Sequence, residues 1–314
     1  MRYKDSATVQ VSQLIPGRYS GLLWGLLGVA AFSLTVPFTR IAVADGHLSP
    51  LFVGAGRAVI AAVLAAAALV VTGQRLPRGR QWLRAAMIAC GVVAGFPLLT
   101  SYALTEVPAS HGAVVIAVLP AATAVCVVLR TGERPGRVFW AAASAGAVAA
   151  IGFAAVRGGG LGPLSWPDLL LFAAVAVCAF GYAEGGLLAR ELGAWQAISW
   201  ALVVAAPLML LLVGVAIAQR PPTGTPVEWG AFGYLAVVSM FLGFIAWYRG
   251  LAIGPMAQVS QVQLTQPVMS ILLGGPAAAR AHRPVHDPRR RGRRLVCTAG
   301  RPRPEPPGIA GRIE

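Results

Sequence analysis

Residues 196–218 read QAISWALVVAAPLMLLLVGVAIA, and no charged side chain interrupts them. An α-helix rises about 1.5 Å per residue, so about 20 apolar residues cross a bilayer core about 30 Å thick. Comparable stretches recur along the chain, separated by short loops rich in Gly, Pro and Arg. The candidate spans are 21–42, 51–72, 83–103, 109–130, 138–156, 168–189, 196–218, 228–248 and 255–273. These nine stretches predict an all-α integral membrane protein.

The composition of the whole chain agrees with this class. Of its 314 residues, 57% are hydrophobic and 12% are charged, whereas soluble domains carry about 25% charged residues. In water such a chain would expose apolar patches that aggregate, which excludes soluble enzymes, coiled coils and disordered scaffolds. No ATP-binding Walker loop occurs, and His and Cys follow no metal-ligand spacing. The sequence therefore predicts neither a cofactor nor a metal.

The positive charges indicate how the spans are oriented. The formal net charge is 26 − 11 = +15. If the N-terminus is cytoplasmic, the inner segments hold twelve cations and the outer loops hold two, Arg157 and Arg220. Because Lys and Arg gather in cytoplasmic loops, we predict a multi-pass membrane protein with a cytoplasmic N-terminus, in which residues 1–20 form a cytoplasmic segment. The first 20 residues lack a signal-peptide pattern, so we expect the first span to be retained.

The last part of the chain departs from this pattern. Residues 274–314 are Pro-rich and carry 10 Arg against 3 acidic residues, and the ninth span would leave them outside. One interpretation is a genuine disordered basic tail. The other is a reading-frame shift that replaced a tenth apolar helix with Arg/Pro-rich sequence. Both stay open; the tail's outer location and lack of aromatic residues argue against nucleic acid as a partner.

The chain also shows internal similarity. A shift of 147 residues aligns Trp82 with Trp229, Leu104 with Leu251, Pro108 with Pro255, Val115 with Val262 and Pro120 with Pro267. We predict two five-helix repeats, 21–156 and 168–273, the second lacking its last helix. Because five is odd, the second repeat would be inverted, as in transporters with a substrate site near mid-membrane between the halves. The alternative is chance similarity between Ala/Val-rich stretches.

Several short motifs occur in a familiar order. They are Trp24-Gly25, Phe32 and Pro37, then Arg57, Tyr102-Ala103-Leu104, Pro108-Ala109-Ser110, Pro120, Gly132-Glu133, Gly250-Leu251 and Gln266-Pro267. In this order they resemble the EamA branch of the drug/metabolite transporter superfamily. The resemblance implies ten helices in two inverted five-helix repeats and an inner-membrane carrier of small metabolites. The chain departs from the family where Gly274-Gly275-Pro276 runs into the tail in place of a tenth helix and a second Gly-Glu closure.

Three ionisable residues within the spans are candidates for a substrate or ion pathway, since such groups usually face the bundle interior or water. Glu184 could take and release a proton, because burial favours the neutral form of a carboxyl group. Alternatively it pairs with Arg190 or another cation near the inner face. Arg57 could hold an anionic group such as a carboxylate, neutralise Glu184, or snorkel towards the outer headgroups. His111 could titrate near neutral pH or lie at the interface.

The ninth span is unusually polar. At 100° per residue, Gln258, Gln261 and Thr265 share one face, while Gln263, Gln266 and Ser270 share another. We expect one face to line a wet cavity and the other to hydrogen-bond a neighbouring helix, and we take Gln258, Gln261 and Thr265 as pathway candidates. Helix packing alone is the alternative. Prolines within spans can kink their helices: Pro37, Pro97, Pro120, Pro207 and Pro267.

Together these features favour a secondary transporter of small polar metabolites or amino-acid-like compounds that works by alternating access. Its expected partners are a small-molecule substrate, the lipid bilayer and, for proton coupling, a proton; a homodimer is an open alternative to a monomer. We do not expect an enzyme, because the four His residues are scattered and no nucleophile-base pair is evident. The alternatives are a truncated transporter remnant and an intramembrane enzyme.

Overall fold

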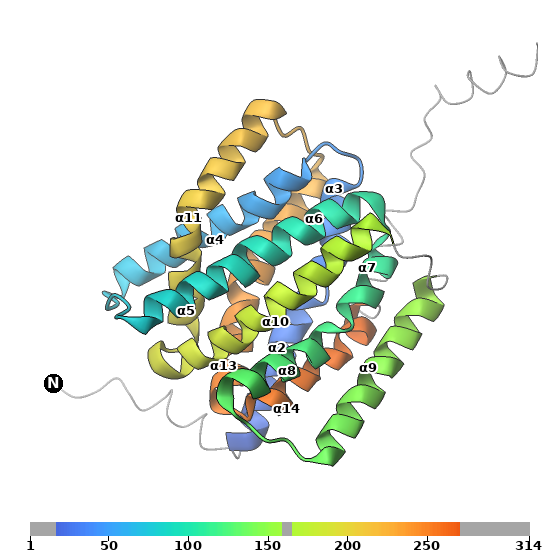
Figure 1. Ribbon diagram of the computed structural model, residues 1–314. Helices are drawn as coiled ribbons and strands as arrows, with labels where there is room; N and C mark the ends of the chain where they lie inside the picture. The colour runs from blue at the N-terminus through green and yellow to red at the C-terminus, as the bar shows by residue number, and fades with distance from the viewer. Residues whose placement is uncertain (1–16, 159–164, 271–314) are drawn as a thin grey trace, which may run out of the picture. The chain divides into compact units, whose positions relative to one another are not determined.

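The computed structural model describes residues 17–158 and 165–270, which are helical apart from short loops and contain no strand (Figure 1). The chain divides into two compact units, residues 1–278 and 279–314. All described residues belong to the first unit. The expectations about residues 1–16 and about the sequence after Ser270, including the basic tail and the tenth helix, lie outside the described residues.

The described part of the N-terminal half, residues 17–158, contains nine helical segments. They are α2 (Gly17–Phe32), α3 (Thr35–Val43), α4 (Pro50–Val71), α5 (Arg80–Ile88), the π-helix η1 (Ala89–Gly95), α6 (Phe96–Glu106), α7 (Ala109–Ile116), α8 (Leu119–Thr131) and α9 (Arg137–Gly158). Several of these segments run directly into one another and together form single longer spans.

The described part of the C-terminal half is also a series of helical segments. Its segments are α10 (Trp166–Leu192), α11 (Ala194–Gln219), α12 (Pro226–Tyr234), the π-helix η2 (Leu235–Leu242), α13 (Gly243–Ile253), α14 (Met256–Ser260) and the 3-10 helix η3 (Gln261–Thr265). Residues 266–270 are helical again.

Among the described residues, seven helical stretches are long and apolar enough to cross a bilayer. They are Ser20–Val43, Pro50–Val71, Arg80–Glu106, Ala109–Thr131, Trp166–Leu192, Ala194–Gln219 and Pro226–Ile253. The two remaining stretches expected from the sequence, at 138–156 and 255–273, fall on α9 and on the helical residues 256–270. The prediction of an all-α membrane protein is confirmed.

Local capping fixes where several spans begin. The Ser49 hydroxyl accepts a hydrogen bond from the Phe52 amide at 3.1 Å, and Pro50 occupies the first turn of α4. At α12, Thr225 and Glu228 form a capping box, in which Glu228 Oε2 accepts from the Thr225 amide at 2.6 Å. These contacts satisfy amides that a helix start leaves without an intrahelical partner. The spans therefore start at defined positions beside their loops.

Four of the described spans are interrupted near their middle next to a proline, and the span from α12 to α13 is interrupted by η2 without one. Pro37, Pro97, Pro120 and Pro267 follow the α2–α3 break, η1, the α7–α8 break and η3. Proline lacks an amide hydrogen, so the carbonyl four residues earlier loses its helical donor. Ser33 O, four residues before Pro37, instead accepts from the Ser270 hydroxyl at 2.6 Å. Pro207, by contrast, lies inside α11, which continues without interruption.

The 147-residue shift also maps helices of the first half onto helices of the second half. Added to the bounds of α6, 96 and 106, it gives 243 and 253, which are the bounds of α13. Added to the bounds of η1, 89 and 95, it gives 236 and 242, which fall within η2. The first residue of α7, 109, maps to 256, the first residue of α14. The third span of each half thus has the same succession of α-, π- and α-helix.

The first helix of each half packs against the third span of the other half. In α2, Gly21 lies beside Gly250 and Gly254, whereas Phe32 lies beside Gly243, so α2 and α13 are antiparallel. A Cβ at Gly250 would lie 2.7 Å from the Gly25 amide nitrogen, and this close approach requires glycine. In the other pair, Arg84 of α5 contacts Glu191 at the end of α10, and Gly91 of η1 contacts Val177. The second helices of the halves, α4 and α11, lie side by side (Figure 1).

The loops gather at two ends of the helix bundle. One end, here called the arginine-rich end, contains the loops at 72–79, 132–136, 193 and 254–255. Gln196 donates to Gln74 at 3.2 Å there, and Arg190 donates to Gly254 O at 3.1 Å. The opposite end contains the loops at 44–49, 107–108 and 220–225, where the Thr223 amide donates to His47 O at 3.2 Å. The orientation of these ends in the membrane stays a prediction.

Candidate functional site: a central cavity

A cavity lies between the two halves, near the middle of the spans. Its empty volume, including the part open to solvent, is about 420 Å³. The lining residues are Phe32, Thr35, Val36, Arg57, Val92, Phe96, Ile116, Leu119, Tyr182, Ser239, Met240, Phe244, Gln263 and Gln266.

The helix interruptions supply most of this lining. Thr35 lies at the break between α2 and α3, Val92 lies in η1, and Ile116 and Leu119 flank the break between α7 and α8. From the second half, η2 contributes Ser239 and Met240, and η3 contributes Gln263. Broken helices at membrane depth are tolerated where the backbone is buried in protein or lines a cavity. The interruptions therefore coincide with the place where a membrane protein can hold a polar ligand.

Arg57 is the only charged residue of the lining. Arg57 is 1% exposed, and it is the only buried lysine or arginine among the residues whose side-chain burial the structure describes. Its guanidinium has no hydrogen-bond partner within the described residues, and both Nε and Nη1 are buried. A charged side chain at the bilayer centre costs about 2.5–3.5 kcal/mol on insertion scales. A charged group that is buried at this cost without a protein partner is a candidate for binding a ligand.

The other polar groups of the lining are largely satisfied by one another. The hydroxyls of Thr35 and Ser239 hydrogen-bond at 2.8 Å and so join the two halves. Gln263 donates to the Tyr182 hydroxyl at 3.5 Å, and Gln266 donates to Phe32 O at 3.3 Å. Gln263 Oε1 is buried without a partner in the described structure. The cavity thus offers unused donors on Arg57 and one unused neutral acceptor.

The rest of the lining is apolar and aromatic. The ring centroids of Phe32 and Phe244 lie 4.8 Å apart, and those of Tyr182 and Phe244 lie 6.0 Å apart. Aromatic pairs at these separations pack favourably and form a rigid wall. The lining is therefore mostly apolar with a few polar groups, as is typical of small-molecule sites.

Glu184 lies outside this lining, towards the arginine-rich end. Its side chain is fully buried, and Oε1 accepts a short hydrogen bond from Arg130 Nε. Oε2 lies 3.7 Å from Arg84 Nε. These contacts correspond to the alternative interpretation of Glu184, in which it pairs with Arg190 or another cation near this end. The partners are Arg130 and Arg84 rather than Arg190. Glu184 links α10 of the second half to α5 and α8 of the first.

Further polar contacts join the halves at the same end. Arg84 also pairs with Glu191. Arg190 Nη2 lies 3.9 Å from Glu133 Oε1, and Glu133 Oε2 accepts from the Ala257 amide at 3.2 Å, in the first turn of α14. Together with Glu184, these groups form what we call the inter-half ion-pair network: Arg84, Arg130, Glu133, Glu184, Arg190 and Glu191. This network holds the arginine-rich end together in the conformation described.

The remaining pathway candidates from the sequence do not line the cavity. His111 lies at the opposite end, where its Nε2 is 2.6 Å from Asp168 Oδ1. Gln258 and Thr265 are exposed. Gln261 donates to Pro120 O and to the Ser260 hydroxyl, both at 3.2 Å. The lining takes its glutamines, Gln263 and Gln266, from the other predicted polar face.

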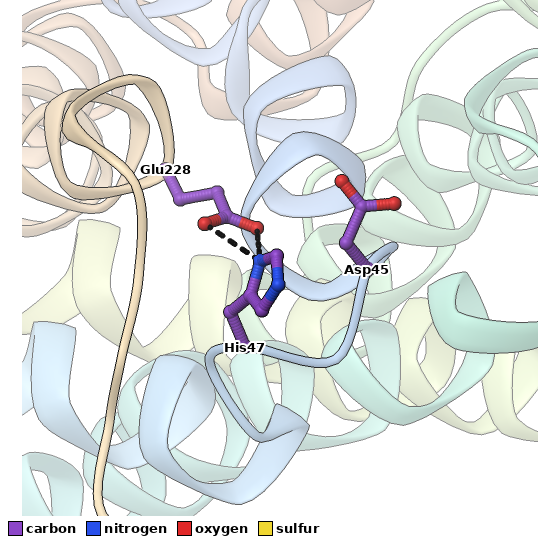
Figure 2. A group of neighbouring side chains, drawn as sticks. All are labelled: Asp45, His47 and Glu228. Carbon is purple, nitrogen blue, oxygen red and sulfur yellow. Dashed lines mark hydrogen bonds and ion pairs between the residues drawn. The ribbon is translucent and has the colours of Figure 1, made fainter. Parts of the chain in front are cut away.

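A second cluster lies at the opposite end, outside the cavity. Figure 2 shows His47 beside the Glu228 carboxylate, with Nδ1 at 3.0 Å from Oε1, and Asp45 on the same loop as His47. One ligand atom from each of the three side chains lies within 4.8 Å of the others, so the group has the residue types and spacing that could hold a metal ion. Glu228 is also engaged in the capping box of α12. No sequence motif indicated this group, because Glu228 is 181 residues from His47.

Comparisons with known proteins agree with a transporter architecture. The EamA-like transporter family matches the chain at residues 19–155 and again at 165–276. The transporter YdeK of Bacillus subtilis is 46% identical over 262 residues, covering 81% of this chain and 87% of that protein. The inner membrane transporter YedA of Escherichia coli K12 is 27% identical over 232 residues, covering 72% of each chain.

Two further similarities concern substrate and fold. A protein of Streptantibioticus cattleyicolor named as a probable terminal-alkyne amino-acid exporter is 27% identical over 263 residues, covering 81% of this chain and 85% of that protein. A solved crystal structure superposes with a TM-score of 0.62 and covers 86% of this chain and 91% of the other. At 21% identity, the second similarity shows the fold alone.

Proposed function

Because this chain belongs to the EamA-like transporter family, we propose that it is a secondary carrier of small polar metabolites, amino-acid-like compounds among them, that binds its cargo in the central cavity. The cavity is lined by helix interruptions from both halves, and this observation carries the proposal. Carriers built from paired repeats bind substrate at such interruptions near the bilayer midplane. The names of the relatives support transport by this chain. The cavity lining supports the class of cargo.

The proposal includes an inverted arrangement of the two halves. Consecutive spans alternate in direction, so the first and third spans of one half run the same way. Since α2 is antiparallel to α13, the third span of the second half runs opposite to the first span of the first half. The antiparallel contact of α10 with the span from α5 to α6 supports the same conclusion. Two halves related in this way could rock against each other around the cavity.

Alternating access requires contacts that break at one end while others form at the opposite end. The inter-half ion-pair network supplies such contacts at the arginine-rich end. At the opposite end, Glu228 of the second half meets His47 of the first, and Asp168 meets His111. We propose that opening towards either side breaks the pairs on that side. By the positive-inside rule, the arginine-rich end would face the cytoplasm of the cell.

The driving force is proposed to be a proton gradient or the gradient of the cargo itself. Proton coupling through Glu184 would require its contacts with Arg130 and Arg84 to break during the cycle. If so, Glu184→Gln would remove the pH dependence of uptake in proteoliposomes. Unchanged pH dependence in this variant would place any coupling elsewhere.

Counterflow in proteoliposomes tests the carrier proposal. Vesicles preloaded with a panel of unlabelled metabolites should accumulate the same labelled metabolite without ATP. Ser239→Trp, which fills the cavity, should abolish this uptake, whereas Val237→Trp should preserve it, because Val237 is exposed on the same π-helix. Equal uptake by the two variants would contradict the cavity as the binding site. No uptake of any panel member by the parent protein would favour the transporter-remnant alternative.

A further inference from the structure

We propose that the cargo is a small monocarboxylate anion with an apolar body, whose carboxylate binds Arg57. This inference rests on the proposed function, because it assigns a substrate class to the same cavity. It goes beyond transport itself by specifying the net charge of the ligand.

The charge of the cavity is not balanced by the protein. Arg57 contributes a positive charge, and none of the lining residues is acidic. The buried carboxylates of the described chain are engaged elsewhere: Glu184 with Arg130, Asp168 with His111, and Glu228 with His47. A ligand with one negative charge would therefore neutralise the site.

The hydrogen-bonding capacity points to the same chemistry. Arg57 Nε and Nη1 are buried donors without a partner in the described residues. A carboxylate accepts such donors with both oxygens, and charge-assisted hydrogen bonds to a guanidinium are stronger than neutral ones. Thr35, Ser239 and Gln266 already form hydrogen bonds within the protein, so they have less remaining capacity to bind a ligand than Arg57 has. Arg57 is thus the group that most needs a ligand.

The remaining lining suits an apolar body and disfavours a second charge. Phe32, Phe96 and Phe244 provide aromatic surface, and Ile116 and Leu119 provide aliphatic surface. The ammonium group of an amino acid would find no carboxylate here, only neutral acceptors such as Gln263 Oε1. Burying a charge without a charged partner is costly. We therefore expect affinity to decrease from carboxylate to zwitterion to amine.

Matched ligand series test this order. One series shares a branched aliphatic body: 4-methylpentanoate, leucine and 3-methylbutylamine. The other shares an aromatic body: 3-phenylpropanoate, phenylalanine and 2-phenylethylamine. Thermal unfolding of the purified full-length protein in detergent, with each ligand titrated, reports binding independently of transport. In at least one series the carboxylate should stabilise the protein most and the amine least.

The critical variant is Arg57→Gln, with Arg220→Gln as its control. Both changes remove one positive charge, but Arg220 is exposed at the opposite end and is not part of the lining. Arg57→Gln should weaken carboxylate binding about tenfold to hundredfold, the loss expected for a hydrogen bond to a charged group. Arg220→Gln should bind like the parent. Size-exclusion profiles and ligand-free melting curves establish that both variants are folded.

The possible outcomes separate this inference from the carrier proposal. Carboxylate binding that depends on Arg57, without counterflow of any ligand, would support the anion site and contradict transport. Counterflow of leucine or an amine that is unaffected by Arg57→Gln would support transport and overturn the anion site. The inference is also overturned if neither carboxylate binds, if the zwitterion or the amine binds more tightly in both series, or if Arg220→Gln has the same effect as Arg57→Gln.

Discussion

The cavity and the arginine-rich end each contain a buried charged side chain, but only the one at the arginine-rich end is paired with other protein side chains. Glu184, at the arginine-rich end, is fully buried and contacts both Arg130 and Arg84. Arg57, in the cavity, is also buried but has no hydrogen-bond partner among the described residues. The two residues were equivalent candidates in the sequence, since both are ionisable groups inside apolar spans.

The difference shows that the burial of a charge does not by itself identify a ligand site. A buried charge with protein partners holds helices together, and removing one partner leaves the others uncompensated. A buried charge without partners destabilises the protein even in the absence of ligand, because its burial is not compensated. The two kinds of site should therefore respond in opposite ways when the charge is removed.

The largest effect is expected for Glu184→Ala. It removes the shared partner of Arg130 and Arg84 and should lower the free energy of unfolding by about 3 kcal/mol, the lower end of the range for breaking a buried ion pair. The lower end applies because both arginines are partly exposed and can reach water. Thermal unfolding in detergent measures the change. A variant as stable as the parent would mean that the network does not hold the halves together.

A smaller effect should distinguish the two arginines. Arg130→Gln removes a direct hydrogen bond to Glu184 and should cost about 1–2 kcal/mol. Arg84→Gln removes a longer contact with Glu184 and a pair with Glu191, whose side chain is 40% exposed, and should cost less than about 1 kcal/mol. The same melting experiment compares them. The reverse order would show that Arg84 is the principal partner of Glu184.

A change of the opposite sign is expected for Arg57→Gln without ligand. Removing an unpartnered buried charge relieves the cost of burying it, so the melting temperature should stay unchanged or rise slightly. This sign is opposite to that expected for Glu184→Ala. A marked loss of stability would show that Arg57 has a structural partner, and the contrast between the two sites would no longer hold.

The spans followed from local sequence, as did the interruptions that lie next to a proline; η2 has no such residue beside it. Apolar length predicted the spans, and Pro37, Pro97, Pro120 and Pro267 lie next to interruptions, because a missing amide weakens a helix wherever it occurs. Pro207 lies in the unbroken helix α11. Membrane helices can accommodate a proline when neighbouring groups satisfy the freed backbone groups, so a proline alone does not determine whether the helix is interrupted.

The site was only partly predictable. Arg57 was identified because a cation inside an apolar span needs an explanation. The ninth span was harder, since its two polar faces were predicted but the cavity is lined by Gln263 and Gln266 rather than by Gln258 and Thr265. Two physical reasons apply. The 3-10 turn at Gln261–Thr265 has about three residues per turn and changes the angular positions, and the neighbours of each face depend on tertiary packing.

Contacts between the halves had no local signal. The pairing of Glu184 with Arg130 joins residues 54 positions apart, and the Thr35–Ser239 hydrogen bond joins residues 204 positions apart. Their chemistry is visible in the sequence, but their proximity depends on how the halves pack. The same holds for Asp45, His47 and Glu228.

Alternating access to the cavity is the central claim, and single-cysteine labelling tests it most directly. With Cys90, Cys126, Cys178 and Cys297 replaced, Ser239→Cys places a thiol in the lining. In vesicles of known orientation, an impermeant thiol reagent should reach it from either side, and a transported cargo should change the two labelling rates in opposite directions. Labelling from one side only, whatever the cargo, would contradict alternating access.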